Sequence, residues 1–102
     1  MKKRIGPKTL LYPMPAVLIG TLVDGRPNFM TAAWSGIACS IPPCISVAIQ
    51  PVRYTCKGIE EHKTFSVNVP SARMVKEVDF CGIYSGSKDD KSNLFSLFYG
   101  SI

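Results

Sequence analysis

The 102-residue sequence lacks most of the groups from which hydrolytic active sites are built. Its only histidine, His62, stands among charged residues and indicates a surface position on a helix. The four cysteines show neither a CxxC redox pair nor the spacing of a zinc site, and the chain contains no P-loop and no GxGxxG fingerprint. It also offers no nucleophile–base pair and no carboxylate dyad. These absences argue against hydrolytic chemistry, so any catalysis would depend on a bound cofactor.

Long hydrophobic runs are absent as well. The longest candidate, Leu10 to Val23, is interrupted by Pro13 and Pro15, and it falls short of the roughly 18–20 residues of a membrane span. Eight glycines and eight prolines argue against a helical bundle. Hydrophobic residues make up 46% of the chain, which predicts one domain over residues 1–102. We interpret the cysteines as reduced, small apolar residues, which indicates a cytoplasmic protein without a membrane segment.

The net charge of +5 is concentrated in one half of the chain. Residues 1–59 carry seven cations and one anion, whereas residues 60–102 carry five cations and six anions. Such an excess suggests an anionic partner, but for the cations of residues 2–4 we favour a solvated basic tail. Nucleic acid is not the expected partner, because no basic stripe alternates with aromatic residues.

The hydrophobic pattern predicts a mostly β protein with short helices in the order β-β-β-α-β-α. The run of residues 16–23 is typical of a buried strand, and the turn residues 24–28 predict an antiparallel partner after it. A closed barrel and an open α+β sandwich both suit this order. The expected strands are Ala16–Val23, Phe29–Ile37, Ile45–Ile49 and a half-buried Phe65–Val69, and the expected helices are Thr55–His62, capped by the Thr55 hydroxyl, and Pro70–Cys81.

The segment 28–36 (NFMTAAWSG) is the first candidate for a binding site. Small residues in a strand, here Ala32, Ala33, Ser35 and Gly36, often mark a close approach by a ligand or by another backbone. A flat heteroaromatic ring would fit, with backbone groups and the Thr31 hydroxyl at its polar edge. A crowded helix–strand crossing explains the same composition.

Two further candidates are polar. Arg53 and Thr55 flank the expected start of a helix, where unpaired N–H groups attract phosphate, and Lys57 would add a second charge. An ordinary helix cap beside solvated charges is the alternative. Asn68 offers donors and acceptors suited to a pyrimidine edge, although a solvent-facing asparagine is common. Trp34 either covers a ring or lies in the core.

Five blocks together resemble one known family. They are NFMTAAWSG at 28–36, CSIPPC at 39–44, RYT at 53–55, FSVNVP at 65–70 and DFCGIYSG at 79–86. This combination is similar to the flavoredoxin branch of the flavin reductase-like, FMN-binding split-barrel family, from about residue 5 to Lys91. The resemblance implies an antiparallel split β-barrel that binds FMN noncovalently as a homodimer. Residues 92–102 depart from the family pattern, so we expect a barrel shortened at its C-terminus with an atypical tail.

The resemblance also implies a set of cofactor contacts. The strand around Thr31 would lie along the isoalloxazine ring, Ser40 near the ring or ribityl chain, Arg53 and Thr55 at the phosphate, and Asn68 at the pyrimidine side. The full set that the resemblance implies for FMN is Asn28, Met30, Thr31, Ala32, Ala33, Trp34, Ser40, Arg53, Tyr54, Thr55, Asn68 and Lys91.

The expected function is electron transfer or flavin reduction by an FMN-binding flavoprotein of flavoredoxin type, with no catalytic side chain assigned. NAD(P)H or a redox protein would be its partner. The alternative is a shortened, non-catalytic module that self-associates through its incomplete barrel, as the apolar residues of the tail from Leu94 to Tyr99 suggest.

Overall fold

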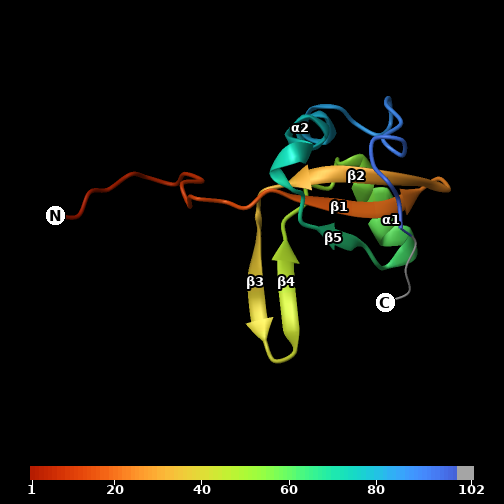
Figure 1. Cartoon of the computed structure of the whole chain (residues 1–102). Helices are drawn as coiled ribbons and strands as arrows, with labels where there is room; N and C mark the ends of the chain where they lie inside the picture. Colours follow the sequence, from red (N-terminus) through yellow and green to blue (C-terminus); the bar gives the residue numbers. More distant parts are fainter. Residues whose placement is uncertain (99–102) are drawn as a thin grey trace.

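The computed structural model describes residues 1–98 and consists mostly of strands with two short α-helices. Strands β1 (Val17–Val23), β2 (Arg26–Ala32) and β5 (Ser66–Asn68) form an antiparallel sheet in the order β2-β1-β5 (Figure 1). Asp24 and Gly25 join β1 to β2 with φ angles of 52° and 78°. Positive φ at both positions is typical of the two-residue hairpin turn, so the predicted antiparallel pair is confirmed.

A second hairpin stands apart from this sheet. Strands β3 (Ser35–Ser40) and β4 (Pro43–Val47) pair only with each other among the described residues and project away from the rest of the chain (Figure 1). The single strand predicted over 29–37 is therefore wrong, because the chain leaves the sheet after Ala32. Ala32 pairs with Val17, the first residue of β1, and Pro15 just upstream cannot extend the ladder.

The core lies between the sheet and helix α1 (Tyr54–His62). Ile19 is fully buried, and Val17 and Ala32 pack beside it on the same face as Met30 and Ile59. A short 3-10 turn, η1 (Ala72–Met74), leads into α2 (Val75–Ile83), which packs against β2. The expected fold class is confirmed as two partial sheets with short helices, and the residues described form no closed barrel.

Two local predictions are corrected. Helix α1 begins one residue earlier than predicted, with Arg53 as its N-cap and no side-chain cap bond, so the Thr55 hydroxyl is not the cap. The predicted strand 65–69 shrinks to three residues, and its expected buried face is not formed, since Val69 is 86% exposed. Only Val67 of that face packs on the core, because the strand pairs with β1 over three positions alone.

The end of the described chain folds back on the sheet. The Phe95 ring meets the Phe29 ring edge-on, with centroids 5.3 Å apart. Phe98 is 93% exposed, and the predicted apolar tail continues beyond the described residues from position 99. No helix in the part of the chain described here has the length and apolar character needed to cross a membrane.

Candidate functional site

A hollow of about 200 Å³ lies along the outer edge of β2. Strand β2 forms one side, the start of α1 forms a second, and the end of α2 with the loop after it forms a third. Most of the residues singled out in the sequence converge here. The hollow is lined by seven of them: Asn28, Met30, Thr31, Arg53, Tyr54, Thr55 and Lys91.

Lys91 is the buried cation of this hollow, only 3% exposed. Its ammonium donates to the Phe29 carbonyl of β2 at 3.0 Å and to the Cys81 carbonyl of α2 at 3.2 Å. Burial disfavours the charged form and holds the pKa of Lys91 below its ordinary value. Cys81 and Asp89 oppose this effect, and repulsion from Arg53 adds to it. Neither carbonyl carries a formal charge, so Lys91 and Arg53 bring two cations to the lining, and the nearby Asp89 offsets Lys91 in part.

Asn28 and Thr55 connect β2 to the first turn of α1. The Asn28 amide donates to the Thr55 hydroxyl at 2.8 Å, and both residues are almost completely buried. Gly86 lies against this pair, since a Cβ atom there would collide with the Asn28 carboxamide and crowd the Tyr54 ring. This packing fixes the N-terminus of α1, with its unpaired N–H groups, at the hollow.

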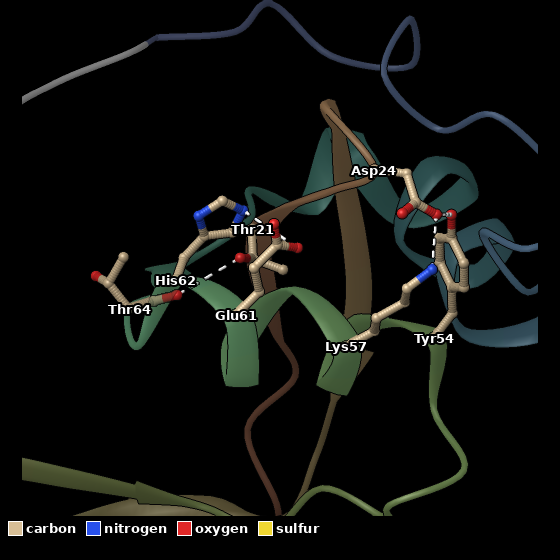
Figure 2. Close-up of polar contacts among 7 residues, drawn as sticks. All are labelled: Thr21, Asp24, Tyr54, Lys57, Glu61, His62 and Thr64. Carbon is tan, nitrogen blue, oxygen red and sulfur yellow. Dashed lines mark hydrogen bonds and ion pairs between the residues drawn. The ribbon is translucent and has the colours of Figure 1, made fainter.

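A cluster on the other side of the α1 start is shown in Figure 2. Asp24, in the β1–β2 turn, accepts a hydrogen bond from the Tyr54 hydroxyl at 3.2 Å and pairs with the Lys57 ammonium at 3.0 Å. Lys57 lowers the pKa of Asp24, and Asp24 in turn raises the pKa of Lys57. Lys57 is thus paired and does not line the hollow, so it is not the second cation predicted there; Lys91 takes that place.

The remaining predicted site residues lie elsewhere. Ala32 belongs to the core, and Ala33 and Trp34 lie where the chain passes from β2 to β3, with Trp34 49% exposed. Ser40 is exposed at the far end of the β3–β4 hairpin. Asn68 donates to the Leu18 carbonyl at 3.1 Å and to the Ser66 hydroxyl, on the side of the sheet away from α1.

Asn68 lines a second and larger hollow of about 430 Å³. It is mostly apolar, between the sheet and the chain at residues 95–98, and its walls include Leu18, Phe29 and Phe65. None of the described Asp, Glu, Lys or Arg side chains lines it, so it differs in chemistry from the hollow beside β2.

One wall of the smaller hollow was not predicted from residue chemistry. Residues 81–86, at the end of α2 and in the loop after it, line it, although only the family resemblance had drawn attention to them. Thr31 is tied to this wall, because its hydroxyl donates to the Val78 carbonyl of α2. The hydroxyl predicted to face a ring therefore has only its lone pairs left for a ligand.

Comparison with known proteins gives consistent results. The flavin reductase like domain family matches residues 9–102, which include the stretch expected to be atypical. A flavoredoxin from Methanosarcina acetivorans is 43% identical with a TM-score of 0.91 over 98% of this chain, and a flavoredoxin of Desulfovibrio vulgaris is 48% identical with a TM-score of 0.81 over 89%. An FMN-binding protein from Thermus thermophilus, solved with 1-cyclohex-2-enone bound, is 26% identical with a TM-score of 0.77 over 89% of this chain. The chain spans about half the length of these proteins: 54%, 50% and 51%.

Proposed function

The chain belongs to the flavin reductase like domain family, and we propose that it binds FMN noncovalently for electron transfer or flavin reduction. The observation that carries this proposal is the hollow beside β2. Seven residues chosen from the sequence line it, and two of them, Arg53 and Lys91, are cations. A flavin supplies electron and hydride transfer, and the protein supplies binding and orientation.

The phosphate of FMN suits the α1 end of the hollow. The N-terminus of a helix attracts anions through its free N–H groups and dipole, and Arg53 is the N-cap of α1. Lys91 adds a charge that the carbonyls around it leave unneutralised. A dianionic phosphate would offset both cations, and it would raise the pKa of Lys91 back toward its ordinary value.

The isoalloxazine ring suits the β2 side. No described strand pairs with the outer edge of β2, so its backbone donors and acceptors can bond the ring edge there. Met30 and Thr31 would form the wall beside the ring. Five residues remain in the proposed set of cofactor contacts although they lie outside this hollow: Ala32, Ala33, Trp34, Ser40 and Asn68.

The size of the hollow supports a homodimer. Ligand pockets commonly span about 300–1,000 Å³, so a hollow of about 200 Å³ would hold part of FMN and leave the rest for another surface to cover. Several large apolar side chains are open to solvent, among them Val52 and Val69, each 86% exposed. Exposed apolar groups of this kind mark association surfaces.

The second candidate is a shortened, non-catalytic module that self-associates through its incomplete barrel. FMN binding distinguishes the two, and light scattering tests the association common to both. For the flavoprotein, the electron donor would be NAD(P)H or a redox protein in the cytoplasm. Loss of NAD(P)H absorbance on mixing with FMN-loaded protein distinguishes these donors.

The direct test is titration of the purified chain with FMN and with riboflavin, followed by visible absorption and flavin fluorescence. We expect flavin bands and saturable binding of FMN. Arg53→Gln should weaken FMN binding about tenfold to a hundredfold, because a charge-assisted hydrogen bond contributes about 1.5–3 kcal/mol. Riboflavin, which lacks the phosphate, should bind the variant as it binds the wild type.

Arg73→Gln is the matched control, since Arg73 is an exposed arginine of η1 that does not line the hollow. It should bind both flavins as the wild type does. Absence of flavin bands from the protein after FMN is added and free FMN is removed by gel filtration would refute the proposal for this chain. An equal loss for FMN and riboflavin in Arg53→Gln would refute the placement of the phosphate.

A further inference from the structure

The β3–β4 hairpin brings two cysteines face to face. Cys39 of β3 and Cys44 of β4 are direct partners in the register, and Ile41 and Pro42 form the turn between the strands. Direct partners in an antiparallel pair project from the same side of the hairpin. Both cysteines are exposed and reduced. The spacing in the sequence gave no CxxC signal, so only the register shows this pair.

The geometry is close to that of a disulfide. Opposed residues in antiparallel strands have Cα atoms about 4.5–5.5 Å apart, and disulfides join Cα atoms about 4.4–6.8 Å apart. The Cys39 thiol donates to the Ile41 carbonyl at 3.3 Å, so it lies beside the turn instead of in a core. The register is irregular between Ile37 and Cys39, and such a bulge lets the strand adjust locally.

The other two cysteines are less suited to exchange chemistry. Burial raises the pKa of both the Cys56 and the Cys81 thiol, which leaves less of the nucleophilic thiolate at neutral pH. Cys81 is also 3% exposed. Neither Cys39 nor Cys44 lines the hollow beside β2. Their hairpin projects away from the β2-β1-β5 sheet (Figure 1). The pair is therefore separate from the hollow beside β2, and of the proposed flavin contacts only Ser40 lies on the same hairpin.

We propose that Cys39 and Cys44 are a vicinal dithiol that a low-molecular-weight disulfide oxidises to an intramolecular disulfide. One thiolate attacks a sulfur of the small disulfide and forms a mixed disulfide, which releases one thiol. The opposed cysteine then attacks the protein-side sulfur of the mixed disulfide and releases the second thiol. The protein loses two electrons and two protons, and the small disulfide gains them.

The second attack depends on the opposed position of the cysteines. Because the two sulfurs are held on one short hairpin, this step is intramolecular and has a high effective concentration. The ring that closes is short, so it constrains the unfolded chain little. An exposed disulfide of this kind is readily reduced again. The modification is thus reversible and confined to the hairpin.

The test treats the reduced chain with oxidised glutathione and measures the intact mass, followed by tryptic peptides. We expect a loss of two hydrogen atoms and one peptide that contains the Cys39–Cys44 bond. Trypsin cleavage after Arg53 separates this peptide from Cys56 and Cys81. Cys39→Ser should stop at a stable mixed disulfide between Cys44 and glutathione. Cys56→Ser, the matched control, should form the same bond as the wild type.

Every other product would overturn the proposal. Two glutathione adducts on the wild type would show that the opposed thiol does not resolve the mixed disulfide. An unmodified pair would show that neither thiol reacts. A bond to Cys56 or Cys81, or one between two chains, would place the reactive pair elsewhere.

Discussion

Replacing Lys91 with methionine removes the link between the edge strand and the second helix. The Lys91 ammonium bonds the Phe29 carbonyl of β2 and the Cys81 carbonyl in the last turn of α2. A cation in the last turn of a helix also interacts favourably with the helix dipole. Methionine keeps the length of the side chain and leaves both carbonyls without this partner. We expect the variant to be less stable and the packing of α2 on β2 to loosen.

The magnitude follows from two opposing contributions. Two charge-assisted hydrogen bonds at about 1.5–3 kcal/mol each would stabilise the fold by about 3–6 kcal/mol. Burying the ammonium opposes this, and the penalty for one buried ion is several kcal/mol. Methionine removes the penalty together with the bonds, so these two contributions largely cancel. The carbonyls left without a partner then cost about 1–3 kcal/mol.

Urea unfolding followed by tryptophan fluorescence measures this difference at neutral pH. Lys88→Met is the matched control, because Lys88 is an exposed lysine of the same segment, and it should change stability by less than about 0.5 kcal/mol. Equal stability of the two variants would refute the structural role of Lys91.

The pH dependence gives a second readout for the same variant. Burial holds the folded-state pKa of Lys91 below the ordinary 10.5. Between these two values the unfolded chain binds more protons, so the contribution of Lys91 to stability rises with pH in that interval. Lys91→Met should lack this rise. An identical pH profile for variant and wild type would contradict the assigned shift.

Two further changes test the packing that places the site. Gly58→Ala should destabilise the chain by about 1–3 kcal/mol, because its Cβ atom would collide with the Leu22 carbonyl where α1 crosses β1. Gly36→Ala is the control and should be nearly neutral, since its Cβ atom would meet nothing within 4 Å. Similar thermal unfolding of the two variants would count against this crossing. Thr55→Val should lower the free energy of unfolding in urea by about 1–3 kcal/mol and weaken FMN binding, because it leaves the buried Asn28 amide without its acceptor. A variant as stable as the wild type would show that this hydrogen bond is dispensable.

The first hairpin was predictable because its signals are local. A buried apolar run ending at Val23, followed by Asp24 and Gly25, specifies both the strand and the turn. The break after Ala32 was not predictable in this way. It depends on where the partner strand begins, and residues 28–36 contain no sign of that position. The extra strand β3 follows from the same non-local register.

The candidate site shows the same division. Arg53 could be placed beside a helix start from its neighbours alone, and the structure puts it at the N-cap of α1. Lys57 lies one helical turn further on, but its pairing with Asp24 depends on the β1–β2 turn reaching over α1. The same holds for Cys39 and Cys44, which are opposed only because Ile41 and Pro42 make the turn. Local sequence predicts helix ends and turns, whereas charge pairing depends on tertiary packing.

The hollow beside β2 forms where secondary structure leaves backbone groups unpaired. The outer edge of β2 has no strand partner among the described residues, the first N–H groups of α1 lie at its N-terminus, and the last carbonyls of α2 lie nearby. Lys91 satisfies two of the carbonyls and brings its charge with it. The groups that remain are donors and acceptors of the backbone, which no substitution other than proline removes. Flavin recognition that rests on them should therefore survive most single substitutions in β2, whereas loss of Arg53 should remove selectivity for the phosphate.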